Sequence, residues 1–156
     1  MALTNKHLRI YRELQIKHPH MHVGGSVGLY LHGINLARFH DAESPDIDIF
    51  HYEFLNLESK KIKYSRRKSH EDFDAAYTCD GIGIDAMWVR QAYCQIEFNG
   101  FVYNVTPLLL ILRGKLNYAL QGVEKHYNDI HEICNVLKYP TITPPIATLK
   151  EDDLPF

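Results

Sequence analysis

The segment PDIDIFH (residues 45–51) constrains the fold more than any other part of the sequence. Apolar and acidic residues alternate in it, and a period of two is typical of a β-strand with one buried face. Ile47 and Ile49 therefore face a core. Asp46 and Asp48 project together from the opposite face. Two like charges on one face repel each other and lose hydration, so the pattern predicts a positive charge between them, such as a divalent cation.

A third acid interrupts an apolar segment further along the chain. In GIGIDAMWV, Asp85 stands between Ile84 and Ala86, which is the pattern of a second buried strand. If that strand neighbours the first, three carboxylates converge, and this is the arrangement that two-metal phosphoryl or nucleotidyl transfer requires. The alternative for Asp85 is an ordinary strand residue whose charge is satisfied by the backbone or by a lysine.

A glycine turn precedes the acidic strand. Residues 21–24 predict a short strand that ends in a sharp turn at Gly24 and Gly25. Ser26 is then expected to cap a helix that extends to about Ile34. Glycines let the backbone approach a ligand closely, and the free N–H groups of a helix start suit a triphosphate. By itself, however, the GGS sequence is equally typical of an ordinary strand-to-helix turn.

The rest of the pattern predicts an α/β fold with a short mixed twisted sheet, helices packed on one side and two C-terminal helices. Asp80-Gly81 and Asn99-Gly100 are hairpin turns, because both dipeptides accept positive φ. The expected boundaries of the other elements are a helix over residues 3–18 with Thr4 near its cap, a polar loop over residues 35–45, a helix capped by Thr106 with Pro107 at its first position, and a helix from about Glu124 to Lys138.

Length and composition bound the domain organisation. A chain of 156 residues with 46% apolar content predicts a single domain over residues 1–139, followed by an extended proline-rich tail over residues 140–156. The net charge of −2 excludes a protein that coats nucleic acid through a general basic field, so any such contact must be local. The charged N-terminal segment and the lack of a long apolar run predict a cytoplasmic protein with no membrane partner.

These motifs resemble a known family. GGSVGLYLHG followed by SPDIDIF, and then by an isolated acid in an apolar strand, is similar to the minimal nucleotidyltransferases of the DNA polymerase beta superfamily. FNGFVYNVTPLLLILRGKLNYA and EKHYNDIHEI resemble the hairpin, the lysine-bearing helix and the Lys-x-x-x-Asp helix of its abortive-infection and stand-alone branch, so the resemblance covers about residues 20–138. The chain departs from the family pattern between Ser26 and Asp46, where ARFHDAESP lengthens the loop.

The resemblance implies a role for each motif. Asp46, Asp48 and Asp85 would hold Mg²⁺, with Asp85 also acting as the base for the acceptor hydroxyl. Gly24, Gly25 and Ser26 would bind the phosphates of a nucleoside triphosphate such as ATP. Lys115, on the first of the two C-terminal helices, would reach the triphosphate, and Lys125 and Asp129 on the second would buttress the pocket or touch the nucleotide.

Several of these residues have plainer alternatives. Lys115 equally fits the solvated side of an amphipathic helix, and Lys125 and Asp129 fit an i, i+4 ion pair better than a binding role. The basic run Lys60–Lys68 could bind an RNA acceptor, although a solvated segment is the more common meaning of such a run. For His18, His20 and His22, surface or capping positions are favoured over a zinc site.

The function expected from this pattern is Mg²⁺-dependent transfer of a nucleoside monophosphate from a nucleoside triphosphate to a hydroxyl acceptor, with release of pyrophosphate. The acceptor could be RNA, a protein or a small molecule. The alternative is a non-catalytic nucleotide-binding or regulatory module, such as a toxin-antitoxin component. A metal-dependent phosphohydrolase would share the paired acids but has little use for a serine-bearing triphosphate turn.

Overall fold

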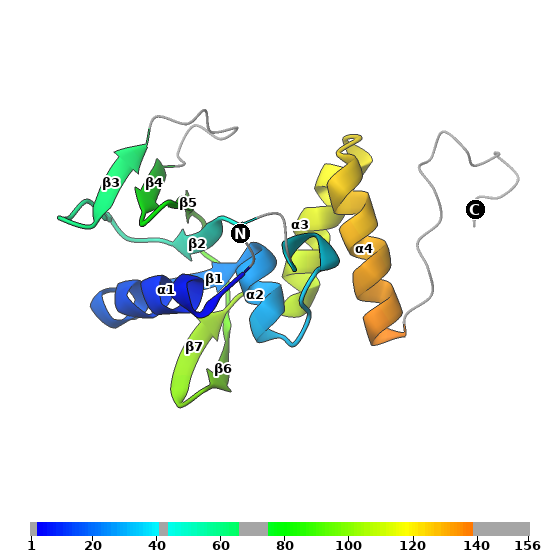
Figure 1. Cartoon of the computed structure of the whole chain (residues 1–156), viewed down its shortest axis with the longest axis horizontal. Helices are drawn as coiled ribbons and strands as arrows, with labels where there is room; N and C mark the ends of the chain where they lie inside the picture. Colours follow the sequence, from blue (N-terminus) through cyan, green and yellow to red (C-terminus); the bar gives the residue numbers. More distant parts are fainter. Residues whose placement is uncertain (1–2, 41–43, 66–74, 139–156) are drawn as a thin grey trace, which may run out of the picture. The chain divides into compact units, whose positions relative to one another are not determined.

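The computed structural model describes residues 3–40, 44–65 and 75–138. Within these residues the chain forms four α-helices, a short 3-10 helix and a sheet of seven strands (Figure 1). In chain order the elements are α1 (Asn5–Lys17), β1 (His22–Gly24), α2 (Gly25–Leu31), η1 (Ala37–Phe39), β2 (Ile47–His51), β3 (Ile62–Ser65), β4 (Ala75–Cys79), β5 (Ile82–Trp88), β6 (Cys94–Phe98), β7 (Phe101–Val105), α3 (Leu108–Leu120) and α4 (Glu124–Leu137).

The sheet is mixed, which confirms the predicted α/β class. Its strand order is β3-β4-β5-β2-β1-β7-β6. The β2–β5 and β1–β7 pairs are parallel, and the other pairs are antiparallel. The two hairpins turn where the sequence predicts them, because Asp80-Gly81 and Asn99-Gly100 all have positive φ, as a two-residue type I′ turn requires. The narrower expectation of a nucleotidyltransferase-like sheet stays a prediction.

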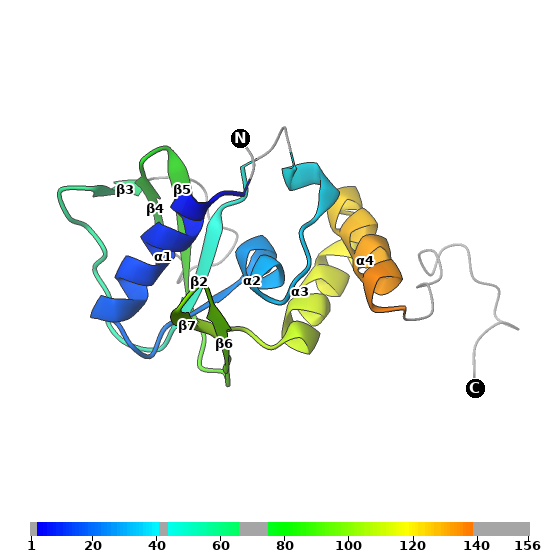
Figure 2. The same ribbon diagram turned by 60° about the horizontal axis from the view of Figure 1, so that its bottom comes forward.

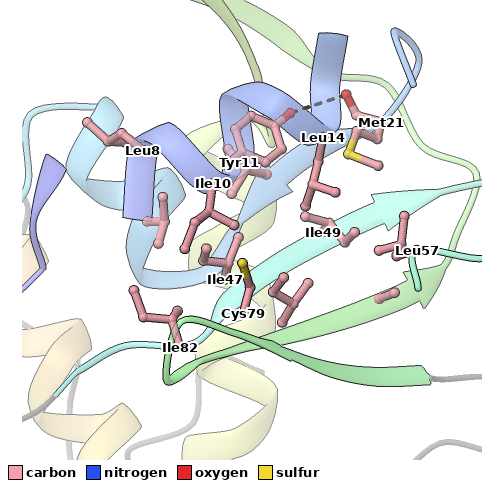
Figure 3. Close-up of a cluster of buried hydrophobic side chains, with 14 of the residues drawn as sticks. Leu8, Ile10, Tyr11, Leu14, Met21, Ile47, Ile49, Leu57, Cys79 and Ile82 are labelled. Atoms are coloured by element: carbon pink, nitrogen blue, oxygen red, sulfur yellow. Dashed lines mark hydrogen bonds between the residues drawn. The ribbon is translucent and has the colours of Figure 1, made fainter. Parts of the chain in front are cut away.

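One face of the sheet carries the apolar core. Ile47 and Ile49 on β2 are fully buried and belong to one cluster with Leu14 of α1 and Val27 of α2. Figure 3 shows α1 lying over the strands, with the side chains of Ile10 and Leu14 directed at this part of the sheet. Because both helices bury side chains in the cluster on this face, the alternate residues of β2 are left on the opposite face.

The opening helix begins as its sequence predicts. Thr4 is the N-cap of α1, and its hydroxyl accepts a hydrogen bond from the backbone N–H of Lys6. The backbone N–H of Thr4 donates to Nδ1 of His7, at 3.1 Å, so the two residues form a capping box with histidine in the place of the usual glutamate. In Figure 2, α1 crosses in front of the strands of the sheet.

Three predicted boundaries are wrong. The N-cap of α2 is Gly24, so Ser26 lies inside the first turn, and the helix ends at Leu31 rather than at Ile34. Thr106 is not the residue before α3, because the helix begins at Leu108 and Pro107 directly precedes it; the Thr106 hydroxyl is hydrogen-bonded to Nδ1 of His22. The loop over residues 35–45 is not simply polar, since Leu36 and Phe39 are buried around η1.

Contacts divide the chain into two compact units, Met1–Ile111 and Leu112–Phe156. The first holds the whole sheet with α1 and α2. The second holds most of α3, all of α4, and a small cluster of Ala119, Ile130 and Cys134. The expectation of one domain over residues 1–139 stays a prediction, and the expected tail over residues 140–156 lies outside the described residues.

A candidate carboxylate site beside a glycine turn

Two of the three predicted carboxylates are direct neighbours in the sheet. β2 and β5 pair in parallel, and Asp48 is the register partner of Asp85. Neighbouring strands lie about 4.8 Å apart, so the two Cα atoms are separated by one strand spacing. The partner of Asp48 on its other side is Gly24 on β1. The row Asp85, Asp48 and Gly24 therefore crosses three adjacent strands at one level.

Burial shows which way these side chains point. Ile47 and Ile84 are register partners with no exposed surface, and Ile49 and Ala86 are almost completely buried partners. Asp48 and Asp85, which alternate with them, are both partly exposed. Because side chains alternate along a strand, both carboxylates lie on the face opposite the apolar core.

The glycine turn lies directly against one of these carboxylates. Gly25 has φ +55°, and a Cβ built on it would collide with Oδ2 of Asp48 and would lie 3.0 Å from Asp48 Cγ. Only glycine combines this backbone conformation with this close approach. The backbone at the start of α2 is thus in contact distance of the Asp48 side chain, on the same face as Asp85.

A histidine and a threonine pack next to the glycine turn. A Cβ on Gly24 would come within 2.6 Å of the Phe50 ring and within 2.8 Å of Thr106 Oγ1. The same Thr106 hydroxyl hydrogen-bonds Nδ1 of His22 at 2.9 Å. The His22 ring stacks between Phe50 and Tyr93, with centroids 5.2 and 5.4 Å away. Burial lowers the pKa of His22 to about 4, so the imidazole ring beside the turn is uncharged at neutral pH.

Asp46 lies one residue before β2 and is exposed. The segment that leads into it is anchored by His7. Because Nδ1 of His7 accepts the Thr4 N–H, its Nε2 carries the proton and donates toward the carbonyl oxygen of Pro45, at 3.2 Å, and toward Ser44 Oγ, at 3.1 Å. Burial is the largest cause that lowers the pKa of His7. The first helix thus fixes the backbone immediately before the acidic strand.

The donor chemistry of the carboxylate pair fits magnesium. Within residues 3–40, 44–65 and 75–138, no group of three or more His, Cys, Asp or Glu side chains is arranged to hold a metal ion, and this applies both to the three predicted acids and to the three histidines near β1. Mg²⁺, however, keeps several waters and is bound through one or two carboxylates together with substrate phosphates. Asp48 and Asp85 supply such a pair. The metal-binding and catalytic roles of Asp46, Asp48 and Asp85 stay predictions.

The predicted lysine of the second unit is buried. Lys115 on α3 is 6% exposed, which rules out the solvated helix face as its environment. Its Nζ donates to Oδ2 of Asp129 on α4 at 2.8 Å. The expected pairing of Asp129 with Lys125 is therefore wrong: Asp129 is buried and needs a buried partner, whereas Lys125 is exposed in the first turn of α4. The nucleotide-binding roles of these three residues stay predictions.

The first half of the basic run forms an edge strand. β3 ends the sheet on one side, with Ile62 at the edge of the core and Lys61 and Lys63 exposed. Lysines on an edge strand discourage pairing with a second chain, which gives these charges a structural use. Residues 66–68 of the run lie outside the described residues.

Sequence reasoning missed the residues that support the site. His7 could have been found, because Thr4-x-x-His7 has the spacing of a capping box. His22 and Thr106 carry no such signal, since they are 84 residues apart and meet only when β1 and β7 pair.

Comparisons with known proteins add no assignment. No family model matches the chain, and no curated protein or solved structure was found to be significantly similar to it. Among the described residues, none of the helices has the length and apolar character needed to span a membrane.

Proposed function

We propose that this protein is a Mg²⁺-dependent nucleotidyltransferase that moves a nucleoside monophosphate from a nucleoside triphosphate to a hydroxyl acceptor. The observation that supports this proposal is the register of β2 and β5. It makes Asp48 and Asp85 neighbours on the face opposite the core, beside a glycine turn. The reaction requires metal binding and phosphate binding. Paired carboxylates suit the metal, and the backbone of a glycine turn beside them suits the phosphates.

The proposal assigns the triphosphate to the turn. The N-cap of α2 is Gly24, which has no side chain with which to cap the helix, and backbone N–H groups at a helix start are suited to phosphate oxygens. α2 has only seven residues, so its dipole contributes little, and direct hydrogen bonds from Gly25 and Ser26 carry the interaction. The hydroxyl of Ser26, which is partly exposed in the first turn, is a further donor to the same phosphates.

The proposal assigns the metal to the acids. Asp48 and Asp85 hold it from adjacent strands, and Asp46 approaches from the segment that His7 anchors. When bound, Mg²⁺ neutralises the developing charge on the phosphates and favours ionisation of the attacking hydroxyl. The close contact of Gly25 with Asp48 holds the carboxylate against the turn to which the proposal assigns the phosphates.

Asp85 is the proposed general base. It takes the proton from the acceptor hydroxyl as the oxygen bonds to the α phosphorus. The bond from that phosphorus to the β-phosphate oxygen breaks, and pyrophosphate leaves with both electrons of that bond. The products are the acceptor joined to a nucleoside monophosphate and free pyrophosphate, so atoms and charge balance.

Labelled substrate tests this proposal. The protein is incubated with each α-labelled nucleoside triphosphate, Mg²⁺ and either total RNA or total protein, and transfer of the label is followed together with release of pyrophosphate. The Asp46→Asn, Asp48→Asn double variant is the negative control, because it keeps the shape of the site and removes two of its three carboxylate charges.

Four outcomes are distinguished. Label on an acceptor with pyrophosphate release, lost in the double variant, supports nucleotidyl transfer. Nucleotide binding without any transfer or hydrolysis identifies the non-catalytic module instead. Orthophosphate release without transfer identifies a phosphohydrolase, and equal labelling by the double variant assigns the activity to a contaminant or to another site.

A further inference from the structure

Exposed aromatic side chains gather where β2 and β5 end. Phe54 is 95% exposed, Trp88 is 40% exposed and Tyr52 is 39% exposed. Large aromatic rings are normally among the main contributors to a core, because each buries about 150–250 Å². Three exposed rings on adjacent segments therefore distinguish this surface from the aromatic residues of the core, and an interaction with a ligand would explain them. With Arg90, which follows β5, they are called the aromatic surface here.

The rings of the aromatic surface contact one another and neighbouring side chains. The Phe54 and Trp88 centroids are 5.1 Å apart with planes at 85°, so the two rings meet edge to face. His51, the register partner of Trp88, lies beside the indole at 5.8 Å. The guanidinium carbon of Arg90 lies 5.7 Å from the centre of the Tyr52 ring. These contacts hold the rings in place while much of their surface stays exposed.

We propose that the aromatic surface is a stacking platform for the bases of a single-stranded nucleic acid. Every base has a flat π-face that stacks on an aromatic ring, and Arg90 supplies a positive charge for phosphate as well as a planar group for stacking. A purely apolar protein partner would leave the Arg90 charge desolvated and unpaired, whereas a phosphate backbone pairs with it. His20, whose ring lies 6.3 Å from that of Tyr52, adds a further hydrogen-bond donor at the rim.

One acid borders the aromatic surface. Glu53 is exposed between Tyr52 and Phe54, and its carboxylate repels a phosphate backbone. This makes Glu53 a useful probe, because removing its charge has opposite consequences for an anionic ligand and for a cationic one.

The aromatic surface is separate from the carboxylate pair. Trp88 follows Asp85 by three residues on β5, about 10 Å along the strand, and because side chains alternate, the indole and the Asp85 carboxylate project from opposite faces of the sheet. The inference concerns binding alone and does not depend on the proposed transfer reaction.

The chain offers a built-in probe, because Trp88 is its single tryptophan. The full chain, without nucleoside triphosphate or Mg²⁺, is titrated with single-stranded RNA, single-stranded DNA and the matched duplex while Trp88 fluorescence is recorded. Stacking of a base on the indole is expected to quench Trp88 fluorescence with one or both single strands. Comparing the RNA and DNA titrations shows whether the surface accepts ribose or deoxyribose strands. The duplex, whose bases are already stacked on each other, is expected to leave the emission unchanged.

Variants of the aromatic surface locate the binding. Phe54→Ala is expected to raise Kd for the strand about 5- to 150-fold, the range for loss of one stacked base, and Arg90→Gln to raise Kd and lessen its salt dependence. Glu53→Gln is expected to lower Kd. Because Phe54 is almost completely exposed, its replacement leaves the fold intact.

Tyr64→Ala is the matched control. Tyr64 is 54% exposed on β3, inside the basic run, so its replacement removes an exposed ring outside the aromatic surface and is expected to leave Kd unchanged. The proposal is overturned if no single strand quenches Trp88, or if Tyr64→Ala weakens binding and Phe54→Ala does not. It is also overturned if sedimentation shows a dimer that Phe54→Asp dissociates, since the surface then joins two copies of the chain.

Discussion

No side chain can be added to Gly25 without striking the carboxylate of Asp48. The two residues come from different elements, the start of α2 and the middle of β2, and their contact fixes the distance between the glycine turn and the carboxylate pair. Backbone donors and carboxylates are therefore placed together by packing alone, before any ligand binds.

Gly25→Ala is expected to destabilise the protein. The new methyl group meets Asp48 and also sits at φ +55°, so overpacking of about 1–3 kcal/mol adds to about 1 kcal/mol of backbone strain. Urea unfolding measures the loss. Gly33→Ala is the control, because Gly33 has φ +88° but no described atom within 4 Å of a built Cβ, and it should show the strain alone. Equal losses in the two variants would refute the close contact with Asp48.

Asp85→Asn is expected to separate nucleotide binding from turnover. Asparagine keeps the shape of the side chain but cannot accept a proton at neutral pH, so transfer should fall by at least about 100-fold while nucleotide affinity changes less. Single-turnover kinetics and equilibrium binding measure the two quantities. Asp80→Asn is the control, since asparagine tolerates the positive φ of that hairpin turn and Asp80 lies outside the site. A full transfer rate in Asp85→Asn would remove Asp85 from the proposed mechanism.

His22 is expected to make stability depend on pH in the acid range. Its folded pKa of about 4 lies below its ordinary value of 6.5, so the unfolded chain takes up the proton first as the pH falls. The stabilisation is complete above pH 6.5 and is lost progressively between pH 6.5 and pH 4, by about 3 kcal/mol in total.

Urea titrations at a series of pH values test this expectation. In His22→Gln, which does not titrate, the dependence of unfolding free energy on pH should weaken by about one proton over this range. It should not vanish, because burial also lowers the pKa of His7 and His51. An unchanged slope in the variant would show that His22 titrates normally in the folded state.

The ion pair of Lys115 and Asp129 is expected to behave as a buried pair. Lys115→Met leaves the carboxylate of Asp129 buried without this partner at 2.8 Å and should cost about 3–5 kcal/mol. The double variant Lys115→Met, Asp129→Leu removes both charges and should recover most of that loss. A double-mutant cycle on unfolding free energies measures the coupling, and additive losses would mean that the pair contributes nothing of its own.

Features with a local cause could be predicted from the sequence. The two hairpin turns follow from Asp80-Gly81 and Asn99-Gly100, because positive φ depends on the residue itself. The exposed face of Asp48 follows from alternation along one strand. Boundaries were less predictable: Thr106 has the sequence pattern of a helix cap, but α3 begins at Leu108, and the Thr106 hydroxyl meets His22, which is 84 residues away in the sequence.

The sequence by itself determined that acids and isoleucines of the segment around Asp48 lie on opposite faces, and that a glycine turn precedes them, since both follow from the geometry of a few consecutive residues. Only the tertiary structure decided that β5 pairs with β2 in the register that joins Asp48 to Asp85, and that Lys115 is the partner of Asp129. Strand order and partner choice depend on which apolar faces pack together across the whole chain, and no local pattern encodes that competition.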